Sequence, residues 1–220
     1  MTIAIDRREF IRSHTSLLSP PLVPEVTLHL AHEALPIWQK TEEDLGEIGL
    51  PPPFWAFAWA GGQALARYVL DNSAIVSGRS VVDLASGSGL VAIAAMKAGA
   101  SSVLAADIDG FAVTAIAINA ALNGVRIEAT PRDLLEIDPP PVDVILVGDL
   151  FYEKALAART LEWLRTAEAK GTQVLIGDPG RSYLPKEKLT KIAEYSVPVS
   201  RDLEDAEIKR AAVWRLASNC

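Results

Sequence analysis

The sequence predicts an α/β fold: a doubly wound, Rossmann-like sheet of seven strands, mostly parallel, with helices on both faces. Strand-like and helical segments alternate from residue 80 onward, which is typical of this class. The run Val142–Val147 is continuously apolar, as expected for a strand buried on both of its faces. Residues 81–92 combine an apolar strand, a glycine-rich turn and the start of an apolar helix. The parallel part of the sheet is therefore expected to begin at this strand.

A small N-terminal appendage is predicted ahead of this sheet, over residues 1–53. It combines a short helix over residues 4–18 with an alternating, strand-like segment over Val23–Ala31. Pro51–Pro53 ends it, because three prolines exclude a helix and disfavour paired strands. Residues 54–220 are then expected to form the main domain.

The elements of the main domain follow from periodicity and from turn residues. The expected strands are Ser80–Leu84, Ser102–Asp107, Val125–Ala129, Val142–Val147, Thr172–Ile176, Tyr195–Val199 and Ala211–Leu216. The expected helices are Gln63–Leu70, Gly89–Ala98, Gly110–Asn123, 153–169 and Lys186–Glu194. The charged segment Arg201–Arg210 separates the last two strands, which predicts an antiparallel hairpin at the end of the sheet.

Composition narrows the class of protein further. A net charge of −7 over 220 residues argues against nucleic acid as a partner, because binding phosphates needs a basic face. Cys220 is the one cysteine, and His14, His29 and His32 form no recognisable ligand pattern, so we expect neither disulfides nor a metal site. The sequence shows neither a membrane span nor the apolar run of a signal peptide. A cytoplasmic location is therefore the default expectation, and we expect the protein to be a monomer.

The glycine-rich turn predicts a site for a nucleoside-containing cofactor, and two cofactor classes compete for it. Gly87-x-Gly89-x-x-Ala92 can be matched to the dinucleotide fingerprint, in which a pyrophosphate lies at the helix N-terminus. Asp83, however, precedes the glycines, and its carboxylate would repel a pyrophosphate. It suits S-adenosylmethionine instead, which carries an ammonium and a sulfonium and no phosphate. The sequence therefore favours S-adenosylmethionine.

Two further acids follow the next two strands. Asp107 ends the second strand of the main domain, where its two oxygens could accept the ribose hydroxyls, and Asp133 follows the third, where it could meet the adenine amino group. A single loop aspartate is more often a turn or cap residue. The ordered set with Asp83 is a stronger signal, because open α/β sheets bind ligands at the carboxyl ends of their strands.

These motifs resemble those of the seven-β-strand S-adenosylmethionine-dependent methyltransferases over residues 54–217. Asp83–Gly89 is similar to their first motif, with Ala85 where glycine is commonest, and Ala106–Asp109 is similar to their second. The resemblance implies that Asp107, rather than Asp109, holds the ribose.

The segment after the fourth strand, Gly148-Asp149-Leu150-Phe151-Tyr152, is the candidate acceptor site. One interpretation is that Asp149 caps the helix that begins near Glu153, with the aromatic residues as ordinary packing. The other rests on a resemblance to the Asp-x-x-Tyr motif of protein-lysine methyltransferases. It implies that Asp149 orients the amine while Phe151 and Tyr152 shape a slot around it. Whether Asp149 also accepts the proton is left open.

An aromatic segment, Phe54 to Trp59, precedes the first helix of the main domain. Each aromatic residue alone is more often packing than binding. Together with Leu28–Glu33 and Gly177–Arg181, however, the stretch Pro51–Leu70 resembles the electron transfer flavoprotein β-subunit lysine methyltransferases. That resemblance implies a protein substrate, the β subunit, and a tryptophan over the cofactor. The residues that these arguments place against the cofactor are Trp59, Asp83, Ala85, Gly87, Gly89, Asp107, Ile108, Asp133 and Asp149.

Three rival functions stay open at this point. The acceptor could be a ribosomal protein or a small-molecule amine, or the chain could be a non-catalytic cofactor-binding module that acts by docking. The intact acidic residues argue against the last. Arg181 either faces solvent, contacts the substrate or closes the site.

Overall fold

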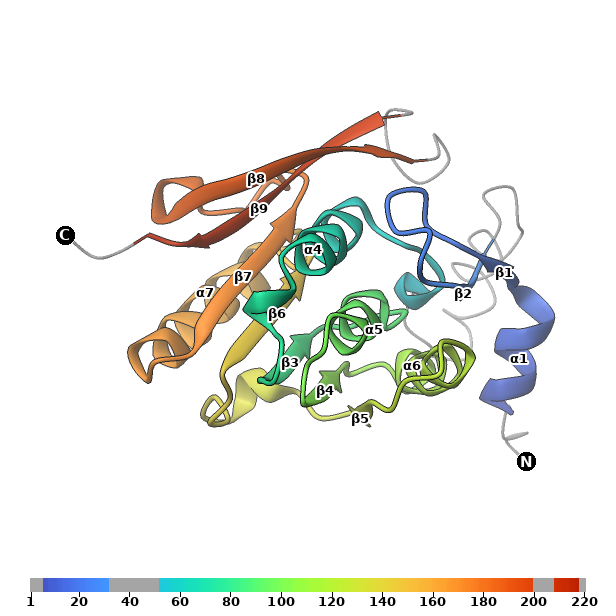
Figure 1. The fold of residues 1–220 in the computed structure, drawn as a ribbon. Helices are drawn as coiled ribbons and strands as arrows, with labels where there is room; N and C mark the ends of the chain where they lie inside the picture. The colour runs from blue at the N-terminus through green and yellow to red at the C-terminus, as the bar shows by residue number, and fades with distance from the viewer. Residues whose placement is uncertain (1–5, 32–51, 200–207, 218–220) are drawn as a thin grey trace.

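The computed structural model describes residues 6–31, 52–199 and 208–217 (Figure 1). Its main sheet has seven strands in the order β5-β4-β3-β6-β7-β9-β8. The strands are β3 (Ser80–Leu84), β4 (Ser102–Ala106), β5 (Glu128–Thr130), β6 (Val144–Gly148), β7 (Gln173–Asp178), β8 (Leu189–Pro198) and β9 (Ile208–Leu216). The pairs from β5 to β7 are parallel, and β9 pairs antiparallel with both β7 and β8. The predicted fold class is confirmed.

Helices cover both faces of this sheet (Figure 1). One face carries α4 (Ala60–Asp71), α5 (Leu90–Lys97) and α6 (Gly110–Leu122), and the other carries α7 (Lys154–Ala169). Short 3₁₀ turns connect these elements: η2 (Phe54–Ala56), η3 (Ser73–Ile75), η4 (Leu134–Glu136) and η5 (Lys186–Lys188). The strands alternate between two hydrophobic clusters, which explains why strands such as β6 are apolar throughout. In the described ranges no helix is long and apolar enough to span a membrane.

One predicted element is wrong. The helix expected over Lys186–Glu194 is the turn η5 followed by the long strand β8, which pairs with β9 along its length. Lysine and glutamate favour a helix locally, but the ladder of hydrogen bonds to β9 outweighs that preference. The register shifts between Lys191 and Ala193, and this irregularity breaks the two-residue alternation that would have marked a strand.

The N-terminal part holds α1 (Arg7–His14) and a two-stranded antiparallel sheet of β1 (Ser16–Leu18) and β2 (Leu28–Leu30). The helix expected over residues 4–18 therefore ends early, and the expected strand over 23–31 is short. Asn119 on α6 accepts a hydrogen bond from the His29 amide at 2.8 Å, so this part is tied to the main sheet's helical layer. Its apolar side chains join the clusters of the main domain. A domain boundary at residue 53 stays a prediction.

The N-terminus of α4 touches the carboxyl end of β7 through two glycines. A Cβ atom on Gly61 would press against the backbone oxygen of Gly177, and a Cβ on Gly177 against the backbone oxygen of Gly61. Because neither residue has a side chain, the N-terminus of α4 can lie directly against the carboxyl end of β7. This approach brings the Gly62 amide to Asp149, which follows β6.

We expect Gly177→Ala to lower the free energy of unfolding by about 3 kcal/mol, because the new methyl group has no space between α4 and β7. Gly171→Ala is the matched control. It faces open space, so only its left-handed backbone is strained, at a cost of about 1 kcal/mol. Urea denaturation of the two variants measures the difference, and equal losses would contradict this account of the packing.

Candidate active site

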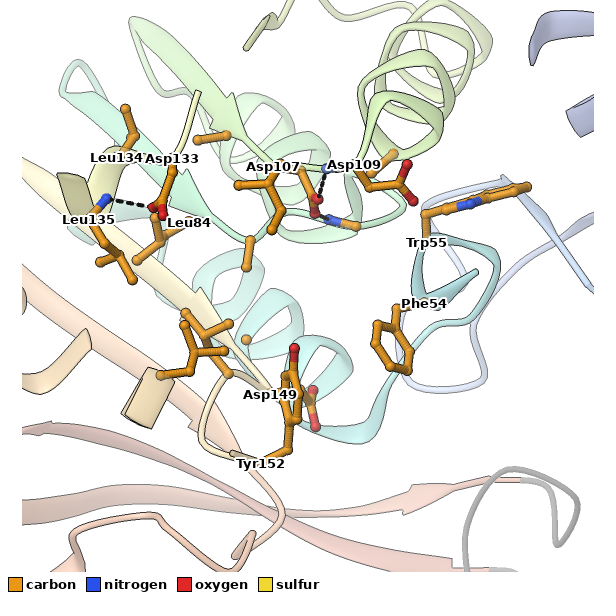
Figure 2. A pocket seen from close by; sticks show the side chains of 18 of the residues that line it. Phe54, Trp55, Leu84, Asp107, Asp109, Asp133, Leu134, Leu135, Asp149 and Tyr152 are labelled. Atoms are coloured by element: carbon orange, nitrogen blue, oxygen red, sulfur yellow. Dashed lines mark hydrogen bonds between the residues drawn. The ribbon is translucent and has the colours of Figure 1, made fainter. Parts of the chain in front are cut away.

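A cavity of ≈ 470 Å³ lies at the carboxyl ends of β3, β4 and β6, beside the aromatic segment at η2 (Figure 2). Most of the predicted site residues line it. These are Trp59, Ala85, Gly87, Asp107, Ile108, Asp133, Asp149 and Tyr152. The cavity therefore brings together predicted residues that are up to 93 positions apart in the chain, counted from Trp59 to Tyr152. In Figure 2, Asp107 and Asp149 approach the hollow from different strands.

The glycine-rich turn takes the backbone shape that its composition predicts. Ala85, Gly87 and Gly89 all have left-handed φ values, of 54°, 55° and 84°. Ala85 is strained there, since a side chain disfavours this region by about 1 kcal/mol. Gly89 lines neither this cavity nor the smaller one described below. It is the N-cap residue of α5, and a Cβ atom on it would lie 3.4 Å from Ile116 of α6, so Gly89 supports the turn rather than the ligand space.

Asp83 is buried beneath the turn. Its carboxylate accepts hydrogen bonds from the Ser86 hydroxyl and, at 3.0 Å, from the Ala92 amide. It does not line the large cavity but a smaller one of ≈ 50 Å³, which shares Trp59 and Asp149 with the large one. Asp83 therefore holds the turn and also borders the place where the two cavities meet.

The pKa of Asp83 is raised to about 7, mainly by burial and also by the negative charge of Asp107, although the Ser86 and Ala92 hydrogen bonds act to lower it. Within the described ranges Asp83 forms no ion pair. A cationic ligand would supply the missing positive charge. The site thus fits a cofactor with an ammonium and a sulfonium group better than it fits a pyrophosphate.

Asp107 at the end of β4 has both carboxylate oxygens held by backbone amides. Oδ2 accepts from Gly87 at 2.9 Å, and Oδ1 accepts from Asp109 at 3.0 Å. Burial raises its pKa. Asp109 itself caps α6 by accepting from the Phe111 amide at 2.8 Å. The cap role of Asp109 is consistent with Asp107 as the ligand-facing acid of this motif.

Ile108 and Asp133 lie at the rim of the cavity. Ile108 is 73% exposed, so an apolar side chain is held open to solvent beside the hollow. Asp133 caps η4 through the Leu135 amide and forms an ion pair of 3.1 Å with Arg159. Sequence reasoning missed Arg159, because it lies 26 positions after Asp133, on α7 beyond β6, and no local motif marks it.

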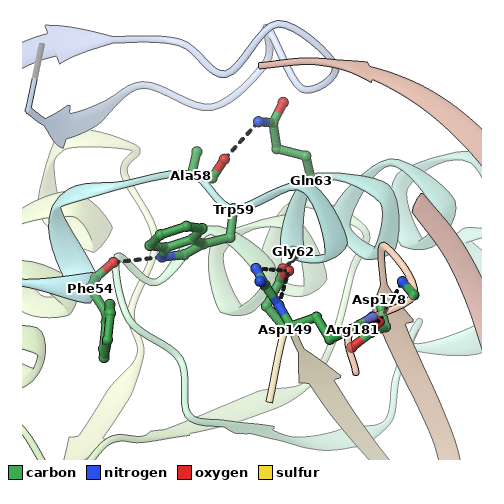
Figure 3. A network of polar contacts seen from close by, with 9 residues as sticks. Phe54, Ala58, Trp59, Gly62, Gln63, Asp149, Asp178 and Arg181 are labelled. Atoms are coloured by element: carbon green, nitrogen blue, oxygen red, sulfur yellow. Dashed lines mark hydrogen bonds and ion pairs between the residues drawn. The ribbon is translucent and has the colours of Figure 1, made fainter. Parts of the chain in front are cut away.

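Asp149 has a left-handed φ of 55° and a buried carboxylate (Figure 3). Oδ2 accepts from the Gly62 amide at 2.7 Å, and Oδ1 accepts from Arg181 Nη2 at 2.7 Å and Nε at 3.1 Å. Burial raises its pKa to about 6, against the lowering effect of the Arg181 charge, and the Asp178 charge adds to the rise. The carboxyl group is thus mostly ionised at neutral pH.

The structure excludes the interpretation of Asp149 as a helix cap. Glu153 caps α7, accepting hydrogen bonds from the Ala155 and Leu156 amides. Asp149 instead points back toward α4, where it accepts a hydrogen bond from the Gly62 amide. The pair Gly61-Gly62 near the start of that helix is the feature of the sequence that could have indicated this close contact.

The two aromatic residues predicted for the slot are placed differently. Tyr152 lines the cavity, is 48% exposed, and has its pKa raised by burial. Phe151 does not reach the slot as predicted: it is fully buried in the hydrophobic cluster under α7, together with Leu150. Phe54 supplies the second aromatic wall, with its ring 5.9 Å from that of Tyr152.

Trp59 completes the wall near Asp149. Its indole Nε1 donates to the Phe54 carbonyl at 2.9 Å, which fixes the ring, and the Arg181 guanidinium lies 5.4 Å from the ring centroid. Figure 3 shows this chain of contacts from Phe54 through Trp59 to Asp149 and Arg181. The slot is therefore aromatic on its sides and acidic at its base.

Comparisons with known proteins find methyltransferases. The ribosomal protein L11 methyltransferase (PrmA) family model matches residues 63–150. An electron transfer flavoprotein beta subunit lysine methyltransferase from Xenopus laevis is 39% identical, covering 97% of this chain and 88% of that protein. Its counterpart from Danio rerio is also 39% identical, covering 98% of this chain and 84% of that protein. The crystal structure of magnesium protoporphyrin IX methyltransferase from Synechocystis PCC 6803 with bound SAM shares the fold, at 15% identity and a TM-score of 0.51, covering 72% of this chain and 80% of that one.

Fold, family model and site define a class I methyltransferase, with S-adenosylmethionine as its methyl donor. The sequence identity to the two relatives above, and the share of the chain that they cover, then define the family. The chain belongs to the electron transfer flavoprotein beta subunit lysine methyltransferase family.

We expect Asp107→Ala to weaken S-adenosylmethionine binding about 100-fold or more, because it removes two charge-assisted acceptors from the cavity wall. Asp138→Ala, which breaks only an exposed ion pair with Lys170, is the control and should bind as the wild type does. Isothermal titration calorimetry measures both affinities. An unchanged affinity in Asp107→Ala would remove this residue from the cofactor site.

Proposed function

We propose that this protein methylates lysine side chains of the electron transfer flavoprotein β subunit, with S-adenosylmethionine as the donor. Support comes from the named relatives, which match nearly the whole chain, and from an acceptor slot of the right chemistry. The match includes the flanking N-terminal and C-terminal parts as well as the cofactor-binding segment, since it covers 97% of the chain.

The observation that carries the proposal is the placement of Asp149 at the base of an aromatic slot. Phe54, Trp59 and Tyr152 offer flat, partly apolar walls, which suit the long methylene chain of lysine and attract its cationic end. The buried carboxylate of Asp149 is a fixed acceptor for an N–H group. A slot of this kind selects an amine at the end of a flexible chain.

The chemistry in this slot requires a neutral amine. Deprotonating a lysine of ordinary pKa near 10.4 costs about 4.6 kcal/mol at pH 7. Burial between aromatic walls lowers the lysine pKa, because desolvation disfavours the charged form. Asp149 then orients the neutral amine by accepting one of its N–H groups, and the proton leaves to water. We assign the main rate enhancement to placing the nitrogen in line with the methyl group.

For the cofactor we propose the following arrangement. Asp107 accepts the ribose hydroxyls, and Ile108 and Asp133 border the adenine at the rim. Asp83, Ala85 and Gly87 face the amino-acid end where the small cavity joins the large one. Trp59 covers the methyl-bearing end, since it lines both cavities and contacts Arg181 beside Asp149.

A ribosomal protein is the second candidate acceptor. An L11 methyltransferase from Caldicellulosiruptor saccharolyticus is 52% identical, but only over 61 residues or 28% of this chain. The L11 family model likewise covers only residues 63–150, the segment that holds the cofactor-facing turn. This similarity supports a shared cofactor-binding segment, and it gives little support for a shared acceptor. The proposal also includes a monomeric state and a cytoplasmic location, and the single cysteine supports the location, since a chain without disulfides suits a reducing compartment.

Incubating the protein and S-adenosylmethionine with unmethylated electron transfer flavoprotein, and in parallel with ribosomal protein L11, tests the acceptor. Mass spectrometry of digested peptides should find methylated lysines in the β subunit and none in L11. Modification of L11 alone would transfer the proposal to the second candidate. Modification of neither would contradict both acceptors.

We expect Asp149→Ala to lower methyl transfer about 100-fold or more while leaving cofactor affinity within a few-fold of the wild type. The pH dependence follows from its pKa, which burial raises to about 6. The carboxylate is ionised above pH 6 and becomes protonated as the pH falls. As the pH is lowered, the logarithm of the wild-type rate should therefore fall by about one per pH unit above pH 6, because the lysine becomes protonated. Below pH 6 it should fall by about two per pH unit, because Asp149 becomes protonated as well. The second break should vanish in Asp149→Ala, and its persistence would contradict the assignment.

A further inference from the structure

The loop after β7 fixes the backbone of Arg181 tightly. Asp178, the last residue of β7, is buried, and its Oδ1 accepts from the Gly180 amide at 2.6 Å and from the Arg181 amide at 2.7 Å. Gly180 has a left-handed φ of 89°, which turns the chain back toward the cavity. The sequence and fold therefore deliver Arg181 to one place, next to the acceptor slot.

The Arg181 side chain is directed at the base of the slot. Two guanidinium nitrogens, Nε and Nη2, bind Oδ1 of Asp149, while the group also lies over the Trp59 ring (Figure 3). The Arg181 side chain is only 20% exposed and that of Asp149 only 9%, so solvent screens this pair weakly. Arg181, Asp149 and Trp59 all line the cavity.

An unpaired carboxylate at this place would hinder the reaction. It would bind the ammonium form of lysine and raise the lysine pKa, because an opposite charge nearby favours the charged form. The ammonium nitrogen has no lone pair and cannot attack a methyl group. A buried acid that only attracts the substrate would therefore hold it in the unreactive state.

We propose that Arg181 is a positioning residue that balances the charge of Asp149, so that Asp149 accepts a hydrogen bond from the neutral amine without stabilising the ammonium. This inference rests on the proposed function. The lysine first loses its proton to water. Its nitrogen lone pair then forms the bond to the methyl carbon as the carbon–sulfur bond breaks, and that electron pair stays on sulfur.

Arg181 is the main positive charge that acts on the Asp149 carboxylate. The charged groups that act on Asp149 are Arg181, which lowers its pKa, and Asp178, which raises it. The other charged residues that line the cavity are Asp107, Asp109, Arg132, Asp133 and Arg159. Arg159 is paired with Asp133, away from Asp149. In the described part of the chain, Arg181 is the cation bonded to the Asp149 carboxylate.

The test compares Arg181→Gln, Arg181→Lys and the control Lys170→Gln, which removes an exposed ion pair on α7. Rates of methyl transfer to the electron transfer flavoprotein β subunit are measured from pH 5.5 to about pH 10, together with KM and kcat. In addition, carbon NMR follows the titration of the Asp149 carboxyl in the protein without substrate. Cofactor affinity, measured by calorimetry, checks that each variant keeps its donor site.

We expect Arg181→Gln to move the rising limb of the pH–rate profile to higher pH by about one to three units, because both the Asp149 and the lysine pKa rise. At pH 7.5 kcat should fall about tenfold or more while KM for the protein substrate does not rise, and the rate should recover at alkaline pH. Arg181→Lys should restore most of the profile, and Lys170→Gln should match the wild type. The Asp149 carboxyl should titrate at higher pH in Arg181→Gln than in the wild type.

Two results would overturn the inference. One is a pH–rate profile of Arg181→Gln that has the same shape and midpoint as the wild-type profile and differs only in its maximal rate. The other is a rise in KM alone with an unchanged Asp149 titration, which would assign Arg181 to substrate docking. If the wild type does not methylate the β subunit, the proposed function fails. The Asp149 titration still decides whether Arg181 sets the charge of this acid.

Discussion

Burial of three carboxylates at one edge of the sheet is the constraint on which the rest of the site depends. Asp83 is the last residue but one of β3, and Asp107 and Asp149 follow β4 and β6, the strands on either side of β3 in the sheet. Each carboxylate is held by backbone amides, and burial raises the pKa of each. An acid in such surroundings favours a cationic ligand, because the ligand charge offsets the cost of keeping it ionised. The cationic cofactor meets this condition at Asp83 and Asp107, whereas Arg181 already balances the charge of Asp149 at the acceptor end.

The packing of the molecule serves the placement of these acids. Left-handed residues in the turn after β3 bring the Gly87 amide to Asp107, and the glycine contact between α4 and β7 brings the Gly62 amide to Asp149. A change at Gly61 or Gly177 therefore affects stability and the acceptor site together. Among the residues that the structure describes, Asp149 is the one of the three acids with a partner cation, and this difference separates the acceptor end of the cavity from the donor end.

Local signals predicted the glycine-rich turn after β3, whereas they could not predict contacts between residues far apart in the chain. The turn at residues 81–92 could be found because glycine spacing and the apolar period report directly on backbone shape. Strand β8 could not be predicted, because Lys191 and Glu194 favour a helix and only pairing with β9 makes the segment a strand. The bond from Arg181 to Asp149 spans 32 positions and depends on how β6 and β7 align. The burial of Phe151, with Phe54 in the slot, likewise depends on tertiary packing.

The most direct test of the central claim is the number of protons released when S-adenosylmethionine binds at pH 6.5. Calorimetry in buffers of different ionisation enthalpy measures it, and at this pH the cofactor amino group, with a pKa near that of an α-amine at about 7.7–8.0, is already protonated. Asp83 has a pKa of about 7, so it is largely protonated in the free protein. If the buried acids are matched to a cationic ligand, binding should release a sizeable fraction of one proton, and Asp83→Asn should abolish most of that release. Binding without proton release, or with equal release in Asp83→Asn, would contradict the account.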